Sequence, residues 1–208
     1  MPNNLTDADV IIVSHGHYDH TGGLNSVLNI ASKAVLYIHP EALKTRYSKK
    51  ENNARMIGMS DSTKQTIQKL ADKKRVVWTE MPTEISQGLF ITSKIPRNTD
   101  YEDTGGSFFV DKNCQNADDI RDDQAIFFES NQGLIVIVGC AHSGVVNTLD
   151  YVTKMTNQNN VYAVAGGMHL VNANSNRIER TIEAFKNMMS KKLYLYIALV
   201  KMELKKYK

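Results

Sequence analysis

The sequence of 208 residues has two cysteines, four prolines and one tryptophan, and it lacks a long run of apolar residues. Two cysteines cannot build a disulfide framework, and Cys114 and Cys140 are not spaced as a Cys-x-x-Cys zinc pair. We therefore expect a reducing, cytoplasmic setting. Residues 193–200 are too few to span a bilayer, and no basic segment followed by an apolar one begins the chain, so we expect no secretory signal and no membrane partner.

A strong charge of either sign is also missing, because the formal net charge is +3. Much of the small positive excess lies in residues 201–208, which we interpret as a solvated tail. A nucleic-acid partner requires a basic patch clustered on the folded surface. We therefore expect no nucleic acid.

What is present is an ordinary globular composition, 42% hydrophobic and 23% charged, in apolar runs that alternate with helical patterns. We expect a single α/β domain, layered in the α+β manner, over residues 1–208. Short apolar runs predict strands at 10–13, 35–38, 75–78, 89–92, 125–128, 134–138 and 161–165, the first buried on both faces and residues 130–133 forming a hairpin turn. Helices are predicted at 24–31, 62–72, 145–155 and 177–189, and a long loop at 97–123.

The segment SHGHYDHTGG at residues 14–23 follows the first expected strand and contains three of the six histidines. Imidazole nitrogen and carboxylate oxygen are natural ligands of divalent ions such as zinc. A loop that leaves a strand can fold back so that His15 and His17 bind one ion, while Asp19 and His20 face a second. The alternative is a cluster of solvated or core-satisfied histidines, which suits a lone histidine better than this spacing.

This pattern, His-x-His-x-Asp-His after a hydrophobic strand, resembles the signature of the metallo-β-lactamase superfamily. The resemblance implies an αββα sandwich in which the two histidines serve one metal and the Asp-His pair serves the other. It also implies a third ligand for the first metal after a later strand, where His142 stands in this sequence. Cys140 lies next to that histidine, and we expect it to be a small buried packing residue.

A closer resemblance is to a subfamily of metal-dependent hydrolases that includes archaeal enzymes of methanopterin biosynthesis, acting on a dihydropterin and a ribofuranosyl-aminobenzene phosphate. The shared features are the segment 14–23, Ile-Pro-Arg at 95–97, Asp-Asp-Gln at 122–124, Gly-Cys-Ala-His at 139–142 and Gly-Gly-Met-His-Leu at 166–170. Where the superfamily carries a metal-bridging aspartate, this chain has His169. Three roles remain as alternatives for it: metal ligand, proton-transfer group or structural residue. Arg97 suits a phosphate or carboxylate of a substrate, with Asp123 at the other end of the long loop. Surface salt bridges are an equal alternative for both residues.

Two departures from the family stand out. Family members begin with a β-rich segment before the histidine motif, and their last metal histidine follows the final strand, whereas here no histidine follows His169. We expect a homologue shortened at both ends, in which the strand at 10–13 lacks neighbours and leaves apolar surface. An alternative is that another chain completes the sheet, and an unpaired edge favours a homo-oligomer.

The remaining residues predict an enzyme. His15, His17 and His142 form a three-histidine site with an open position, where a divalent ion lowers the pKa of a bound water to about 7. We expect hydrolysis of an ester, phosphoester or related bond in a small-molecule substrate, with Asp19 or His169 moving the proton. Zinc is the expected metal, as one or two ions, with iron or manganese as alternatives. A pterin-related transferase and a degenerate, non-catalytic metal-binding homologue are the other two hypotheses.

Overall fold

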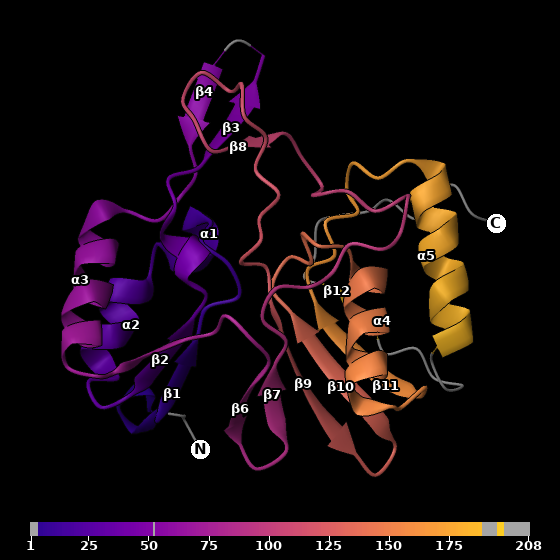
Figure 1. The fold of residues 1–208 in the computed structure, drawn as a ribbon, viewed down its shortest axis with the longest axis horizontal. Coiled ribbons are helices and arrows are strands. Elements are labelled where there is room, and N and C mark those ends of the chain that lie inside the picture. The colour runs from indigo at the N-terminus through magenta and orange to yellow at the C-terminus, as the bar shows by residue number, and fades with distance from the viewer. Residues whose placement is uncertain (1–3, 52, 189–194, 198–208) are drawn as a thin grey trace.

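The computed structural model describes residues 4–51, 53–188 and 195–197, in which two sheets lie between two layers of helices (Figure 1). The first sheet is parallel and has three strands in the order β1-β2-β5. Its strands are β1 (Val10–Ile12), β2 (Val35–Ile38) and β5 (Val76–Trp78). Helices α2 (Leu24–Ile30) and α3 (Asp61–Asp72) cover its outer side, and three short helical turns border it: η1 (Leu5–Asp7), α1 (Tyr18–Thr21) and η2 (Pro40–Leu43).

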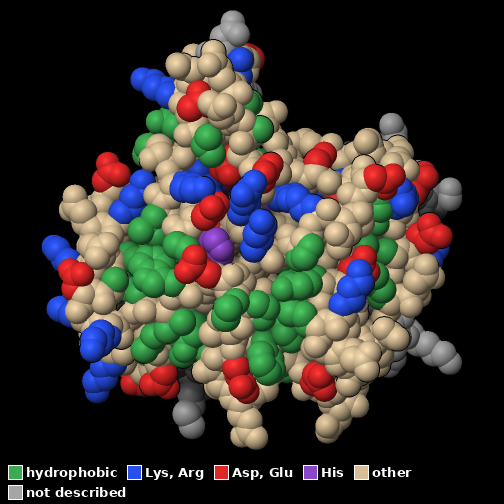
Figure 2. Space-filling model, viewed as in Figure 1, with side chains coloured by type: hydrophobic (Ala, Val, Ile, Leu, Met, Phe, Trp, Pro, Cys, Tyr) green, Lys and Arg blue, Asp and Glu red, His purple; other side chains and the backbone are tan. Residues whose placement is uncertain are grey.

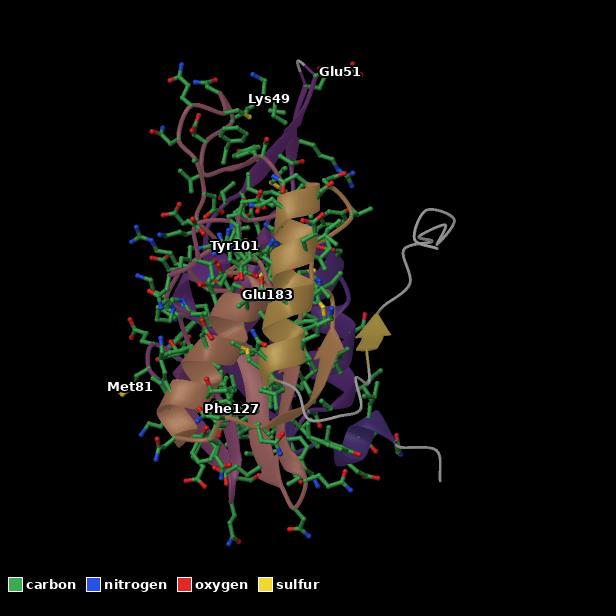
Figure 3. The ribbon with its side chains drawn as sticks, turned by 90° about the vertical axis from the view of Figure 1, so that its right-hand side faces the viewer. Lys49, Glu51, Met81, Tyr101, Phe127 and Glu183 are labelled. Atoms are coloured by element: carbon green, nitrogen blue, oxygen red, sulfur yellow. The ribbon has the colours of Figure 1, made fainter. Side chains whose placement is uncertain are left out.

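The second sheet has six strands in the order β12-β11-β10-β9-β7-β6. Its strands are β6 (Thr83–Ser86), β7 (Leu89–Ile91), β9 (Ala125–Ser130), β10 (Gly133–Val138), β11 (Val161–Gly166) and β12 (Leu195–Ile197). Helices α4 (Val145–Thr156) and α5 (Ser175–Met188) cover its outer face (Figure 3). The expected layered α/β fold is therefore confirmed.

A small third sheet projects beyond the sandwich, at the top of Figure 1. It joins the hairpin of β3 (Tyr47–Lys50) and β4 (Asn53–Met56) to the two-residue strand β8 (Phe108–Phe109). Neither this hairpin nor β6 was predicted, because their sequences are polar and their faces are largely exposed. The expected loop at 97–123 is otherwise irregular and connects this sheet to β9.

The helices follow from apolar spacing and from their caps. In α3, Ile67 and Leu70 are buried, and the side chain of Ser60 accepts the N–H of Thr63 at the helix start. In α4, buried side chains recur at Val145, Leu149 and Val152. Two hydrophobic cores result, one under α4 and α5 and one under α2 and α3. The predicted strands, the four helices and the 130–133 turn are all present within one or two residues, while Met189 and the tail at 201–208 lie outside the described residues.

Strand β1 departs from both expectations made for it. It pairs in parallel with β2, so the expectation that it lacks neighbours is wrong on one side, and its residues are half-buried rather than buried on both faces. On its other side it pairs with no strand in the described part of the chain, and a cleft there is lined by Ile12, Ser14, Ile126 and Ile137 among others. No helix among the described residues is long and apolar enough to cross a membrane.

The strand ends that carry the histidine motifs meet at one edge of the sandwich. Strands β10 and β11 are parallel, and the N–H of Gly167 donates to the carbonyl of Gly139 where they end. The side chain of Gln124, just before β9, donates to the carbonyl of Val13, just after β1, and so ties β1 to the same edge. The two sheets therefore bring residues far apart in sequence to one place.

Candidate metal centre

His15, His17 and His142 form a compact triangle at this edge. Each pair of rings has its centroids 4.7 Å apart, and one ligand nitrogen from each ring lies within 4.8 Å of the other two. All three side chains are buried, with His15 and His142 fully so. The structure thus brings together the three residues predicted to hold the first ion.

The hydrogen bonds of this cluster fix the tautomer of His142 and leave two ring nitrogens of the cluster without a partner. The Nδ1 of His142 lies 2.7 Å from the carbonyl oxygen of Thr104, and a carbonyl can only accept, so Nδ1 donates and Nε2 carries the lone pair. The Nε2 atoms of His142 and His17 are both buried without a hydrogen-bond partner in the described structure. A buried nitrogen without a hydrogen-bond partner destabilises the folded state. Coordination to a divalent ion would give both nitrogens a partner, so the residues fit a metal.

Burial also keeps these imidazoles neutral at pH 7. Burial, followed by the neighbouring His142, lowers the pKa of His15 well below its usual value. Burial and the Arg46 guanidinium lower the pKa of His17 to about 3, and burial and His17 lower the pKa of His142 to about 2. A neutral imidazole is the form that binds a metal.

Asp19 and His20, on the short helix α1, lie at the exposed side of this cluster. The Nε2 of His20 is 3.7 Å from Oδ2 of Asp19 and 3.1 Å from Sγ of Cys140. Cys140 was expected to be a buried packing residue, but it is only partly buried and faces the histidines. Burial, then the charges of Asp19 and Asp123, raises the pKa of the Cys140 thiol to about 12.

His169 follows β11 and reaches the same cluster. Its ring centroid is 4.4 Å from that of His142, and its Nδ1 is buried without a hydrogen-bond partner among the described residues. One ligand atom from each of Cys140, His142 and His169 lies within 4.8 Å of the other two. Burial lowers the pKa of His169. The structure therefore places this residue beside the site, as either a ligand or a proton-transfer group requires.

Arg97 and Asp123, the predicted substrate-binding residues, hold the turn that presents His142. Arg97 donates to the carbonyl of His142 at 2.8 Å, and Asp123 accepts the N–H of Ser143 at 2.7 Å. Asp123 is fully buried, and burial raises the pKa of its carboxyl to about 6. This placement favours a positioning role for Asp123, while Arg97 remains exposed on one side.

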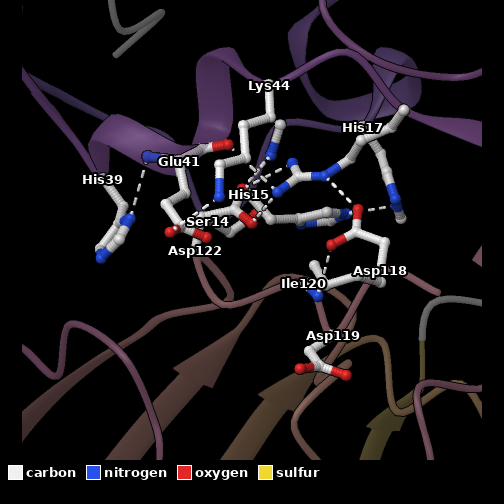
Figure 4. Close-up of polar contacts among 12 residues, drawn as sticks. Ser14, His15, His17, His39, Glu41, Lys44, Asp118, Asp119, Ile120 and Asp122 are labelled. Carbon is white, nitrogen blue, oxygen red and sulfur yellow. Dashed lines mark hydrogen bonds and ion pairs between the residues drawn. The ribbon is translucent and has the colours of Figure 1, made fainter. Parts of the chain in front are cut away.

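A buried ion-pair network, which was not predicted from the sequence, lies beneath residues 15–17, here called the metal loop. The guanidinium of Arg46 donates to Asp118 at 2.6 Å and makes two hydrogen bonds to Asp122, one of them at 2.9 Å (Figure 4). Burial opposes the charge of Arg46, but Asp122 and Asp118 outweigh it and raise the pKa of Arg46. Asp122 also accepts the N–H of Gly16 at 2.7 Å. The network therefore fixes the backbone between His15 and His17.

The comparisons with known proteins agree with this site. A family model described as the metallo-beta-lactamase superfamily matches residues 4–150, which is more than half of the chain. The chain belongs to the metallo-β-lactamase superfamily. Membership implies divalent-metal binding, and the clusters around His142 are candidate sites for it.

Relatives of two kinds are similar to this chain. It is 30% identical over 195 residues to the 7,8-dihydropterin-6-methyl-4-(beta-D-ribofuranosyl)-aminobenzene-5'-phosphate synthase of Methanocaldococcus jannaschii, covering 91% of this chain and 66% of that protein. It is also 30% identical over 186 residues to an uncharacterized protein of the same organism, covering 89% of this chain and 67% of that one. The chain thus spans about two thirds of the length of these relatives.

A solved structure resembles the fold as a whole. The crystal structure of Tm1679, described as a metal-dependent hydrolase of the beta-lactamase superfamily, matches with a TM-score of 0.68 and 26% identity, over 93% of this chain and 78% of that one. The match supports a metal-dependent hydrolase kind of protein. The synthase among the relatives leaves the specific reaction to be proposed.

Proposed function

We propose that the protein is a metal-dependent hydrolase that cleaves an ester, phosphoester or related bond in a small-molecule substrate. The observation that carries the proposal is the triangle of His15, His17 and His142, buried, neutral and with two Nε2 atoms lacking partners. Three neutral nitrogen ligands and an open position are typical of catalytic zinc sites. Zinc is the metal we propose, with iron or manganese as alternatives for the same donors.

A divalent ion bound there supplies Lewis acidity, which makes water a nucleophile at neutral pH and polarises a substrate oxygen. The chain supplies the proton-transfer groups. Asp19 is exposed beside the cluster, and His169 presents a neutral ring with an unpartnered Nδ1. We assign proton transfer to these two residues.

Charged side chains lie near the centre of one face of the molecule. Figure 2 shows acidic and basic side chains there, with apolar side chains further out. Arg97, exposed on one side and anchored to the His142 carbonyl, offers a cation for a phosphate or carboxylate of the substrate. A small anionic substrate suits this residue.

The second candidate function is a transfer reaction that joins a pterin to an aryl ribose phosphate. It is favoured by the 30% identity to the archaeal synthase over 91% of this chain. The two functions share the metal centre and differ in the acceptor, which is water in one and the pterin partner in the other. A non-catalytic metal-binding protein is the third possibility that an assay must separate.

The test is turnover by protein loaded separately with zinc, manganese or iron(II). The substrates are aryl phosphomonoesters, aryl phosphodiesters and carboxylic esters, and a parallel reaction contains a dihydropterin with an aryl ribose phosphate. We expect hydrolysis that requires the metal and is abolished in His142→Ala. The control is His39→Asn, a histidine outside the cluster whose Nδ1 accepts the N–H of Glu41, a role that asparagine keeps.

Each result decides between the functions. A free hydrolysis product supports the hydrolase, and a coupled product detected by mass spectrometry replaces it with the transferase. Loaded, folded protein that turns over neither set of substrates contradicts both enzymatic functions and leaves the metal-binding protein.

A further inference from the structure

We propose that Arg177 binds the anionic group of the substrate, a phosphate or a carboxylate, through the edge of its guanidinium that carries Nε and Nη2. The inference deepens the proposed function and rests on it, because the substrate concerned is the one hydrolysed at the metal triangle. Arg177 lies in the first turn of α5, and its side chain is only 2% exposed. The site is therefore built into the interior of the protein.

The guanidinium of Arg177 is buried with only one of its three nitrogens bound. Its Nη1 donates to the carboxylate of Asp103, whereas Nε and Nη2 are buried without a hydrogen-bond partner among the described residues. These two nitrogens donate from the same edge of the planar group, the edge that can hold two oxygens of a carboxylate or phosphate at once. An arginine does not lose its proton in proteins, so both donors persist. The unfilled edge is thus complementary to an oxyanion.

The second arginine that is buried in the described chain, Arg46, shows how a structural guanidinium is satisfied in this protein. Every nitrogen of Arg46 donates, and the acceptors are Asp118, Asp122 and the carbonyl of Glu41. A buried N–H without an acceptor destabilises the folded state. Arg177 carries that cost at two nitrogens, and a bound anion would supply the missing acceptors.

A short segment, residues 102–106, here called the strap, links Arg177 to the metal centre. Asp103 of the strap binds Nη1 of Arg177, and the carbonyl of the next residue, Thr104, accepts from Nδ1 of His142. Successive Cα atoms are about 3.8 Å apart, so these two contacts lie close together. An anion on Arg177 therefore holds the rest of a small substrate beside the metal triangle.

The strap also provides a way for the anion to reach the covered guanidinium. Because Nε and Nη2 are buried, surface residues must move before a ligand can bind them. The side chain of Asp103 is 74% exposed, and Gly105, with a φ of 80°, and Gly106 follow it. Two glycines allow the backbone to change direction at low cost. Outward movement of the strap breaks the Asp103 ion pair and opens the guanidinium to the substrate.

The test is calorimetric titration of the metal-loaded full chain with phenylphosphonate and with benzoate, two anions that contain no ester bond. We expect at least one of them to bind the wild type. Arg177→Lys keeps the charge but removes the two-donor edge, so the affinity should fall about 10- to 100-fold. The matched control is Arg180→Lys, also on α5, because Arg180 pairs with Asp100 through Nη1 but is 45% exposed. Its affinity should equal that of the wild type.

A second pair of variants decides the question even where Arg177→Lys fails to fold. Asp103→Asn removes the charge that competes for the guanidinium and loosens the strap, so the anion should bind about 2- to 5-fold more tightly. Asp100→Asn removes an equally exposed carboxylate from the pair with Arg180, and it should leave the affinity unchanged.

Each outcome supports or overturns the anion site. Equal affinities in the wild type and folded Arg177→Lys overturn it and assign the anion to the metal or to Arg97. Unchanged or weaker binding in Asp103→Asn also overturns it, as does folded wild type that binds neither anion. Anion binding that depends on Arg177, without turnover of any ester, supports the site and contradicts the proposed hydrolysis alone.

Discussion

The Oδ2 atom of Asp122 accepts the backbone N–H of Gly16 at 2.7 Å, across 106 positions of sequence. Gly16 stands between the two histidines of the first motif, and Asp122 is held by the buried guanidinium of Arg46. The same carboxylate therefore anchors the metal loop and pairs with a buried charge. The contact joins the two halves of the chain at the candidate metal centre.

Arg46→Met is expected to destabilise the protein by about 3–5 kcal/mol, because it leaves Asp118 and Asp122 buried without their partner. Chemical denaturation measures the loss. The control is Arg121→Met, whose pair with Asp119 is exposed, and it is expected to cost less than about 1 kcal/mol. Equal losses in the two variants would show that the buried network does not stabilise the fold.

Gly16→Ala is expected to distort the metal loop. A Cβ at this position would clash with the carbonyl oxygen of Ala42, a backbone atom that cannot move aside as the end of a flexible side chain can. Overpacking of this kind costs about 1–3 kcal/mol, and metal affinity should fall with it. Gly23→Ala, where a Cβ meets nothing within 4 Å, is the control and should keep both properties. Unchanged metal affinity in Gly16→Ala would rule out the tight packing of this loop as a requirement.

Asp123→Asn is expected to become more stable relative to the wild type as the pH rises from about 4 to about 7. Burial raises the pKa of the Asp123 carboxyl from 3.8 to about 6. As the pH rises through this range, the unfolded chain ionises more readily than the folded one, so the wild type loses stability and the asparagine variant does not. At about 1.4 kcal/mol per pH unit, the difference approaches about 3 kcal/mol. Asparagine can still accept the N–H of Ser143 through its amide oxygen.

The measurement is the unfolding free energy of both proteins across this pH range. Asp111→Asn is the control, and its stability relative to the wild type should change with pH in the opposite direction. Hydrogen bonds, first among them the N–H of Asn116, lower the pKa of the exposed Asp111, so that variant should lose relative stability as the pH rises. A pH-independent difference between Asp123→Asn and the wild type would contradict the raised pKa.

His169→Gln tests the proton-transfer role proposed for this residue against a role as a metal ligand. If His169 moves a proton, the variant should keep the ion held by the three-histidine triangle and lose turnover by about 10²–10⁴-fold. The metal content and kcat of the same preparation test this, using the substrate that the wild type hydrolyses. A lost ion with the activity restored at high metal concentration would assign His169 as a ligand instead.

Much of this fold could be predicted because its segments are locally consistent. β2 coincides with its predicted range, and α3 follows from the apolar positions Ile67 and Leu70. The closeness of His15 and His17 could be predicted because their spacing after a strand is itself the chemical signal of a metal site. That His142 joins them could be predicted only from the family resemblance.

The rest depends on contacts that local sequence does not encode. Arg46 stands in a polar segment with several lysines, and only the fold brings it to Asp118 and Asp122. Cys140 has the small size of an ordinary packing residue, and its closeness to His20 arises from two strands that end at the same edge. The polar hairpin of β3 and β4 lacks the apolar alternation that predicts strands.

The central claim is that His15, His17 and His142 hold a divalent ion, and metal content per chain tests it most directly. Protein purified without added metal is analysed by elemental analysis, alongside His142→Ala and the control His39→Asn. The account predicts one or two ions per chain in the wild type and the control, and a clear fall in His142→Ala. Folded wild-type protein that contains no metal and takes up none on addition would contradict it.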